Sequence, residues 1–111
     1  MSKHLVFLFL ALLVLPSCMN REKVRKPDVF LEEQQMIDVL TDSYLIEAEL
    51  NQMKAAGTDV SSLQKAYYEQ LFEHYGITDS IFEQNMYYYS HHPDVLERMM
   101  DSVTNRFVKA Q

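Results

Sequence analysis

The 111-residue chain carries 10 basic and 16 acidic side chains, which give a net charge of −6 with histidine neutral. The imbalance is concentrated from Pro27 onward, where 15 acidic and five basic residues give a net charge of −10. A body this acidic has no basic stripe to neutralise phosphates, which excludes nucleic acid as a partner. The single cysteine excludes an internal disulfide, so packing alone must stabilise the folded part.

The N-terminus has the pattern of an export signal. Lys3 precedes an almost unbroken apolar run, Leu5–Leu15, which is shorter than the roughly 20 residues of a membrane-spanning helix. Ser17 and Cys18 follow, and this order resembles the lipobox of bacterial lipoproteins, in which the cysteine is acylated and becomes the new N-terminus. We therefore expect a signal peptide over residues 1–17 and a lipid such as palmitate on Cys18.

Three alternatives fit the sequence less well than the lipobox, and one of them, a buried structural cysteine, does not suit a position directly after an export signal. A plain secretory signal is cut after a pair of small residues, whereas Leu15 and Pro16 stand near this cleavage point. An N-terminal membrane helix needs about 20 apolar residues, whereas the apolar run in this chain already breaks at Pro16.

Acylation of Cys18 also predicts where the protein is located. We expect it in the cell envelope, anchored to a membrane by the lipid, and either facing the periplasm or lying in the outer membrane.

Residues 18–29 have the composition of a flexible basic tether. From Cys18 to Lys26, four basic residues and one acidic residue give a net charge of +3. Near a membrane, each Lys or Arg gains on the order of 1 kcal/mol against anionic head groups, while the acidic body is repelled. A purely solvated spacer is the alternative interpretation and also stays open.

Residues 30–111 predict an all-α domain, a small bundle of about four helices joined by short loops. The first helix is predicted to begin between Phe30 and Glu32 and to end near Ala56. Its apolar residues cover more than half of its circumference, which predicts a central helix contacted on several sides. No stretch alternates apolar and polar residues as a strand would.

Capping and breaking residues delimit the other three helices. A loop over residues 57–62 precedes the second helix, which is predicted to end near Tyr75. The predicted caps are Ser61 or Ser62 for the start of the second helix, Gly76 for its end, Thr78 for the third helix, and Pro93 at the first position of the fourth. One residue on each helix is predicted to be buried: Leu40, Leu71, Phe82 and Met99.

Several short motifs follow one another in the helical part. They are Met36-x3-Leu40-x-Asp42-x2-Leu45-x-Glu47-Ala48, Tyr75-Gly76-Ile77-Thr78, Phe82, Tyr88-Tyr89 and Pro93. With the lipobox cysteine and the basic spacer, their order resembles a domain-of-unknown-function family of small all-helical lipoproteins of the Bacteroidota. The resemblance covers the whole chain, with one departure: Tyr44 stands where a histidine is expected. It implies a helical fold and an envelope location, and it carries no assigned reaction.

Glu47 is the acidic residue with the strongest claim to a functional role. It lies one turn from Tyr44 on a largely apolar side of the first predicted helix. A carboxylate there needs a partner, and it could contact a ligand or a basic residue of another protein. The alternative, which we favour, is a carboxylate that is hydrogen-bonded within the bundle to Tyr67, Tyr75 or Tyr89.

The remaining polar groups give no catalytic set. Asp38 and Asp42 lie one turn apart, but two carboxylates are too few for a dedicated cation site, so we expect a solvated face and no metal. The adjacent His91 and His92 point in different directions, which suits neither a zinc pair nor an acid–base dyad. We expect His92 near the start of the last helix, and we expect neither catalytic residues nor a cofactor.

Seven tyrosines are many for so small a domain. If Phe82, Met86 and Tyr89 share the inward face of the third helix, Tyr87 and Tyr88 lie toward its edges and should be at least partly exposed. Because tyrosine is favoured at interfaces, a protein-contact patch is one interpretation. A thin core with a tyrosine-covered rim is the other, and the sequence leaves both open.

Two functions follow from these features. The first is a membrane-anchored lipoprotein that acts as a non-catalytic interaction or accessory subunit of an envelope assembly, with a protein partner of unknown identity. The second is a small-ligand-binding or hydrolytic site around Glu47 and neighbouring tyrosines. Residues 30–111 leave little volume for a ligand pocket of roughly 300–1,000 Å³, so we favour the first.

Overall fold

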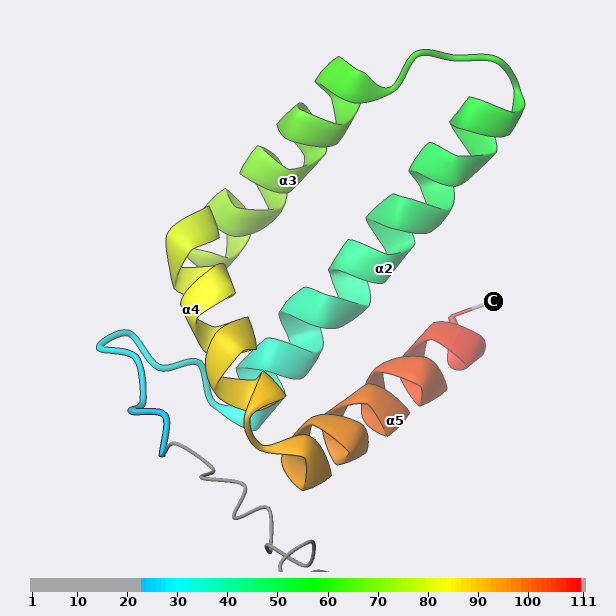
Figure 1. The fold of residues 1–111 in the computed structure, drawn as a ribbon. Helices are drawn as coiled ribbons and strands as arrows, with labels where there is room; N and C mark the ends of the chain where they lie inside the picture. Colours follow the sequence, from blue (N-terminus) through cyan, green and yellow to red (C-terminus); the bar gives the residue numbers. More distant parts are fainter. Residues whose placement is uncertain (1–22, 111) are drawn as a thin grey trace, which may run out of the picture.

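The computed structural model describes residues 23–110, which form four helices and no strand. The helices are α2 (Glu33–Ala55), α3 (Ser61–Tyr75), α4 (Asp79–Ser90) and α5 (Pro93–Lys109) (Figure 1). The predicted all-α fold of about four helices is confirmed. The predictions for the signal peptide and for Cys18 lie outside the described residues.

Reciprocal hydrogen bonds set the start of α2. The backbone N–H of Glu32 donates to Oε1 of Gln35 at 3.0 Å, and the Glu32 side chain accepts from the Gln35 backbone in return. This capping box satisfies two backbone donors that the first helical turn leaves free. The first helical residue is therefore Glu33, one residue after the predicted range.

The start of α3 differs from the prediction. Its N-cap position is Val60, and both serines that were predicted to cap it lie inside the helix. The Asp59 carboxylate instead accepts from the backbone N–H of Ser61 at 3.1 Å and from its hydroxyl at 2.8 Å. These bonds lower the pKa of Asp59. The prediction of Ser61 or Ser62 as the cap was wrong because an Asx turn two residues upstream takes that role.

The other predicted caps are confirmed. Gly76 ends α3 with a φ of 64°, a left-handed conformation that glycine adopts without steric cost. The Thr78 side chain accepts from the backbone N–H of Ile81 at 3.2 Å at the start of α4. Pro93 is the first residue of α5, where its missing N–H costs nothing.

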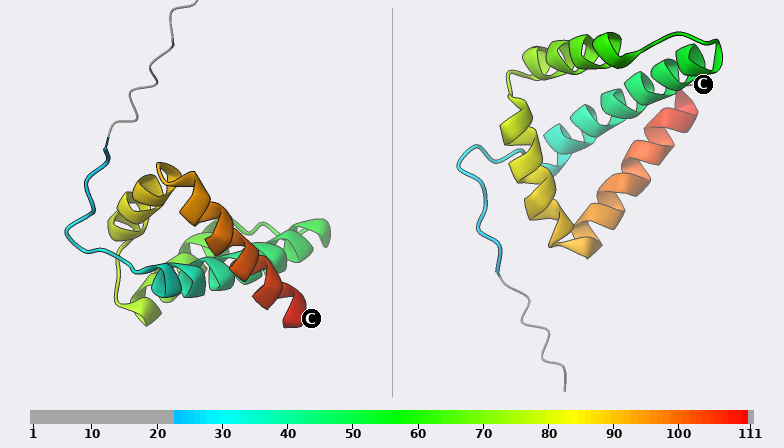
Figure 2. Two further views of the ribbon diagram at one scale, coloured as in Figure 1. Left: turned by 90° about the horizontal axis from the view of Figure 1, so that it is seen from below. Right: turned by 45° about the horizontal axis from the view of Figure 1, so that its top comes forward.

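The helix α2 lies between α3 and α5, as predicted for a central helix (Figure 1). The helix α3 returns antiparallel to α2, whereas α5 runs in the same general direction as α2 and crosses it at an angle (Figure 2). The short α4 connects the end of α3 to the start of α5 and packs against α5. The tether therefore enters α2 at the same end of the bundle as α4 (Figure 1).

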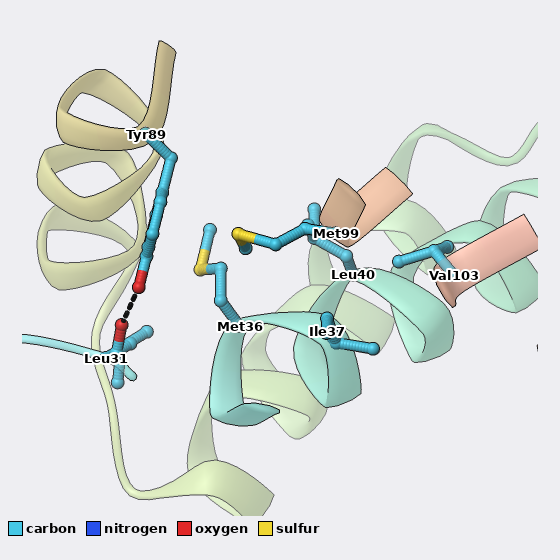
Figure 3. Packing of buried hydrophobic residues seen from close by; sticks show 7 residues of the cluster. All are labelled: Leu31, Met36, Ile37, Leu40, Tyr89, Met99 and Val103. Carbon is cyan, nitrogen blue, oxygen red and sulfur yellow. Dashed lines mark hydrogen bonds between the residues drawn. The ribbon is translucent and has the colours of Figure 1, made fainter. Parts of the chain in front are cut away.

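The principal core lies where α2, α4 and α5 meet (Figure 3). Met36 of α2, Tyr89 of α4 and Met99 of α5 are almost completely buried there. Leu40 and Met99 are thus buried as predicted, and so is Leu71 on α3. Burying these side chains is the main stabilising contribution in the helical domain, since residues 30–111 contain no cysteine that could form a disulfide.

Phe82 is only half-buried, so the prediction that it is buried was wrong. It packs against the edge of the principal core, and its ring centroid lies 5.4 Å from that of Phe72 on α3. Phe82 stays partly exposed because α4 covers only one end of the bundle (Figure 1). The buried position on α4 is that of Asn85, about one helical turn after Phe82.

Candidate functional site

Glu47 is half-buried and engaged within the bundle. The Tyr68 hydroxyl of α3 donates to its carboxylate at 2.5 Å. Burial, and secondly this carboxylate, raise the pKa of Tyr68 above its usual value, so the phenol stays protonated as a donor. Internal hydrogen bonding was predicted correctly, but the partner is none of the three tyrosines expected, because α3 is rotated so that Tyr68 rather than Tyr67 faces Glu47.

The carboxylates of α2 tie it to α3. The Tyr75 hydroxyl donates to the Asp42 carboxylate and lies 3.3 Å from the backbone carbonyl of Asp38. Burial, followed by the hydrogen bond to Asp42, raises the pKa of Tyr75. Two tyrosines of α3, seven residues apart, thus bind two acids of α2 along the antiparallel contact.

Arginines tie α2 to α5 in the same manner. The Arg98 guanidinium donates to both carboxylate oxygens of Glu33, at 3.0 and 3.2 Å, and Arg106 donates to the Asp38 carboxylate. The earlier acid pairs with the earlier arginine, which is the order that helices running in the same direction require. Asp38 and Asp42 are half-buried and partnered, so the expected solvated face was wrong. Among residues 23–110, no group of three or more potential ligands is placed to hold a metal ion.

Tyr44 lies on the α5 side of α2. Its side chain is 46% exposed and borders a small hollow of about 170 Å³, whose other walls come from α5. Those walls are Met100, Val103, Thr104 and Phe107. Val108, on the same helix, is 64% exposed. An exposed apolar surface therefore runs along the outer side of the contact between α2 and α5.

Tyr87 and Tyr88 are neighbours with different surroundings. Tyr87 is 58% exposed, and its ring centroid lies 4.4 Å from that of His91. Tyr88 is half-buried and packs edge-on against Phe30 at 5.2 Å and beside His92 at 4.3 Å. Both are at least partly exposed, as predicted, but Tyr88 belongs to the rim of the core. His92 occupies the N-cap position of α5, also as predicted.

Asn85 is a buried polar residue whose role the sequence analysis missed. Its amide oxygen accepts from the backbone N–H of Leu31 at 2.8 Å, and its amide nitrogen donates to the carbonyl of Val29 at 2.9 Å. A third bond, of 2.8 Å, goes to the carbonyl of Ile81 within α4. The available signal was the spacing of four residues from Ile81 to Asn85 and from Asn85 to Tyr89, which places all three on one helix face.

Tyr89 strengthens the same attachment. Its hydroxyl donates to the backbone carbonyl of Leu31 at 2.6 Å (Figure 3). Burial, and then the charges of Glu32 and Glu33, raise the pKa of Tyr89 to about 12. Asn85 and Tyr89 together fasten the segment before α2 onto α4, so the end of the tether has a fixed place on the domain.

The candidate residues do not converge on one site. Glu47 faces α3, Tyr44 faces α5, and Tyr87 lies on α4. Cys18 lies outside the described residues. None of the four helices α2–α5 is long and apolar enough to cross a membrane.

Comparisons with known proteins place the helical part in a family. No curated protein and no solved structure matches the chain significantly. A family model described as a domain of unknown function, DUF4296, matches residues 27–111. The match covers all four helices and begins where the basic tether ends. The chain therefore belongs to the DUF4296 family.

Proposed function

We propose that this protein is a membrane-anchored bacterial lipoprotein, whose helical domain is a non-catalytic interaction or accessory subunit of an envelope assembly. The observation that carries the proposal is the sequence Leu15-Pro16-Ser17-Cys18 at the end of an apolar run, followed by a basic tether. Two or three acyl chains on Cys18 would hold the protein stably, since one chain alone binds membranes only marginally.

The attachment of the tether supports a role at the membrane surface. Asn85 and Tyr89 bind the backbone of residues 29–31, so the domain cannot swivel freely at the start of α2. The fastened segment begins 11 residues after Cys18, and 11 residues span at most about 40 Å, so a lipid on Cys18 would keep the domain close to the membrane. Proximity favours docking to a neighbouring membrane protein by raising the effective concentration of the two proteins.

The exposed apolar surface along α2 and α5 is the proposed contact for the protein partner. It contains the half-exposed Tyr44 next to the half-buried Met100 and Phe107. The exposed Val108 lies one helical turn after Thr104 on the same helix, α5. Large exposed apolar side chains that cluster in this way are typical of interaction surfaces. The alternative of a ligand or hydrolytic site at Glu47 has less support, because Tyr68 already engages that carboxylate.

Site-specific photo-crosslinking in intact cells tests the proposed contact. A photoreactive amino acid at position 44 should crosslink one defined membrane or envelope protein, which mass spectrometry can name. The matched control carries the same group in place of Ala66, an exposed residue of α3. Crosslinking at neither position, or the same products at both, would contradict an interaction surface at Tyr44.

A further inference from the structure

The tether runs beside α4 (Figure 1), and basic and aromatic side chains lie where the two segments meet. A shallow, mostly apolar hollow of about 600 Å³ separates the two segments. It is lined by Val24, Arg25, Pro27, Glu83, Gln84 and Tyr87. We define the tether–α4 surface as Lys23, Arg25 and Lys26 from the tether, the half-exposed Val29, and Tyr87 from α4.

The parts of this surface keep their relative positions. Asn85 lies two residues before Tyr87 on α4 and binds the carbonyl of Val29 directly. The Lys26 ammonium lies 4.6 Å from the ring centroid of Phe30, which holds the basic end of the tether beside the domain. The tether and the exposed Tyr87 ring therefore form one continuous surface rather than two independent segments.

The length of chain between the lipid and this surface is short. Lys23 is the fifth residue after Cys18, and five residues span at most about 18 Å. On the lipid anchor proposed above, on which this inference rests, Lys23 stays within that distance of the membrane. Among the residues that the structure describes, those of the tether are therefore the nearest to the lipid along the chain.

The tether–α4 surface carries less negative charge than the remainder of the domain, so it is the side that an anionic membrane repels least. The acids near Lys23, Arg25 and Lys26 are Asp28, Glu83 and Glu32, the last of which lines a small hollow together with Lys26. Glu33 lines the same hollow but is paired with Arg98. The Arg25–Asp28 pair, at 3.9 Å, is almost fully exposed, so it stabilises little and leaves the arginine able to exchange partners. Acidic residues dominate the remainder of the domain, so repulsion turns that remainder away from an anionic membrane.

We propose that the tether–α4 surface lies on an anionic lipid bilayer, with its basic side chains among the head groups and the Tyr87 ring at the interface. Each Lys or Arg near such a membrane contributes on the order of 1 kcal/mol, and tyrosine is enriched at the boundary between lipid and water. Tyr87 is then a membrane contact, and the contact with a protein partner lies on the α2–α5 side of the domain.

Tryptophan fluorescence can test this arrangement directly. The chain has no tryptophan, so Tyr87→Trp introduces a single reporter, and Tyr44→Trp is the matched control at a second exposed tyrosine. Position 44 lies 11 residues along α2 from Glu33, or roughly 16 Å from the end where the tether enters. The lipidated full-length mature protein is reconstituted into vesicles of phosphatidylcholine with phosphatidylglycerol that contain a brominated lipid as quencher.

Flotation of the vesicles is measured first, because it reports on the anchor alone. Both variants should float, and the brominated lipid should quench the indole at position 87 several-fold more strongly than the indole at position 44. Omitting phosphatidylglycerol, or adding Arg25→Glu and Lys26→Glu, should reduce the difference between the two positions.

The outcomes separate the two proposals. If both variants float and the two positions are quenched equally, the anchor is retained and the membrane-facing surface is wrong. If quenching at position 87 does not depend on phosphatidylglycerol, the requirement for an anionic surface is wrong. If neither variant floats, the lipid anchor fails, and the inference that rests on it fails as well.

Discussion

Replacing Asn85 with alanine should lower the free energy of unfolding of the domain by about 1–3 kcal/mol. The substitution removes the partner of the Leu31 N–H and the partner of the Val29 carbonyl. Each backbone group that stays buried without a partner costs about 1–3 kcal/mol. The Val29 carbonyl can turn toward water, because Val29 is half exposed, whereas Leu31 is buried. The lost bond to Ile81 adds little, since that carbonyl also belongs to the hydrogen-bonding ladder of α4.

Urea unfolding of a Pro27–Gln111 fragment measures this cost, and Gln84→Ala is the matched control. Gln84 is the exposed neighbour on the same helix, so its replacement should change stability by no more than about 0.5 kcal/mol. Hydrogen exchange adds a local readout, because the Leu31 amide should lose protection in Asn85→Ala. Equal unfolding midpoints for the two variants, with Leu31 still protected, would refute the proposed fastening of the tether.

Three further predictions concern the core, the tyrosines of α4 and the effect of pH. In urea melts, Leu40→Ala should lower the free energy of unfolding by about 2–5 kcal/mol and Phe82→Ala by clearly less, because only Leu40 is buried. Equal losses of free energy in the two variants would contradict the assigned burial. Tyr87→Ser should leave the midpoint unchanged within about 0.5 kcal/mol, whereas Tyr88→Ser should lower it by removing the contacts with Phe30 and His92. Because burial raises the pKa of Tyr89 to about 12, its stabilising contribution is complete below pH of about 10 and is lost as the pH rises toward 12. The free energy of unfolding should therefore fall less steeply between about pH 10 and pH 12 in Tyr89→Phe than in the wild type. Identical pH profiles for the two proteins would contradict this role of Tyr89.

Local chemistry allowed the helices to be predicted from the sequence. Gly76, Thr78 and Pro93 each favour a helix boundary through their own backbone or side chain, and all three act where expected. The cap of α3 was misassigned because Asp59 and the two serines after it are all good capping residues. Which of them provides the cap depends on the path of the loop, which composition does not determine.

The pairing of side chains between helices depends on tertiary packing and could not be predicted from the sequence. Tyr67 and Tyr68 are adjacent on α3, and a rotation of one residue, about 100°, decides which of them meets Glu47. That rotation depends on how α3 packs against α2, which periodicity constrains only loosely. Asn85 was missed for a related reason: patterns of apolar residues pass over a polar residue that stands on the buried face.

Metabolic labelling with palmitate tests whether Cys18 carries the lipid anchor. The bacterium expresses either the wild-type chain or Cys18→Ala, and each protein is purified, checked for label and weighed by mass spectrometry. Because Cys18 is the only cysteine, we expect label in the wild type alone, on a chain that begins at Cys18. Equal label in Cys18→Ala, or an unlabelled wild-type chain, would contradict the lipid anchor on which the proposed function rests.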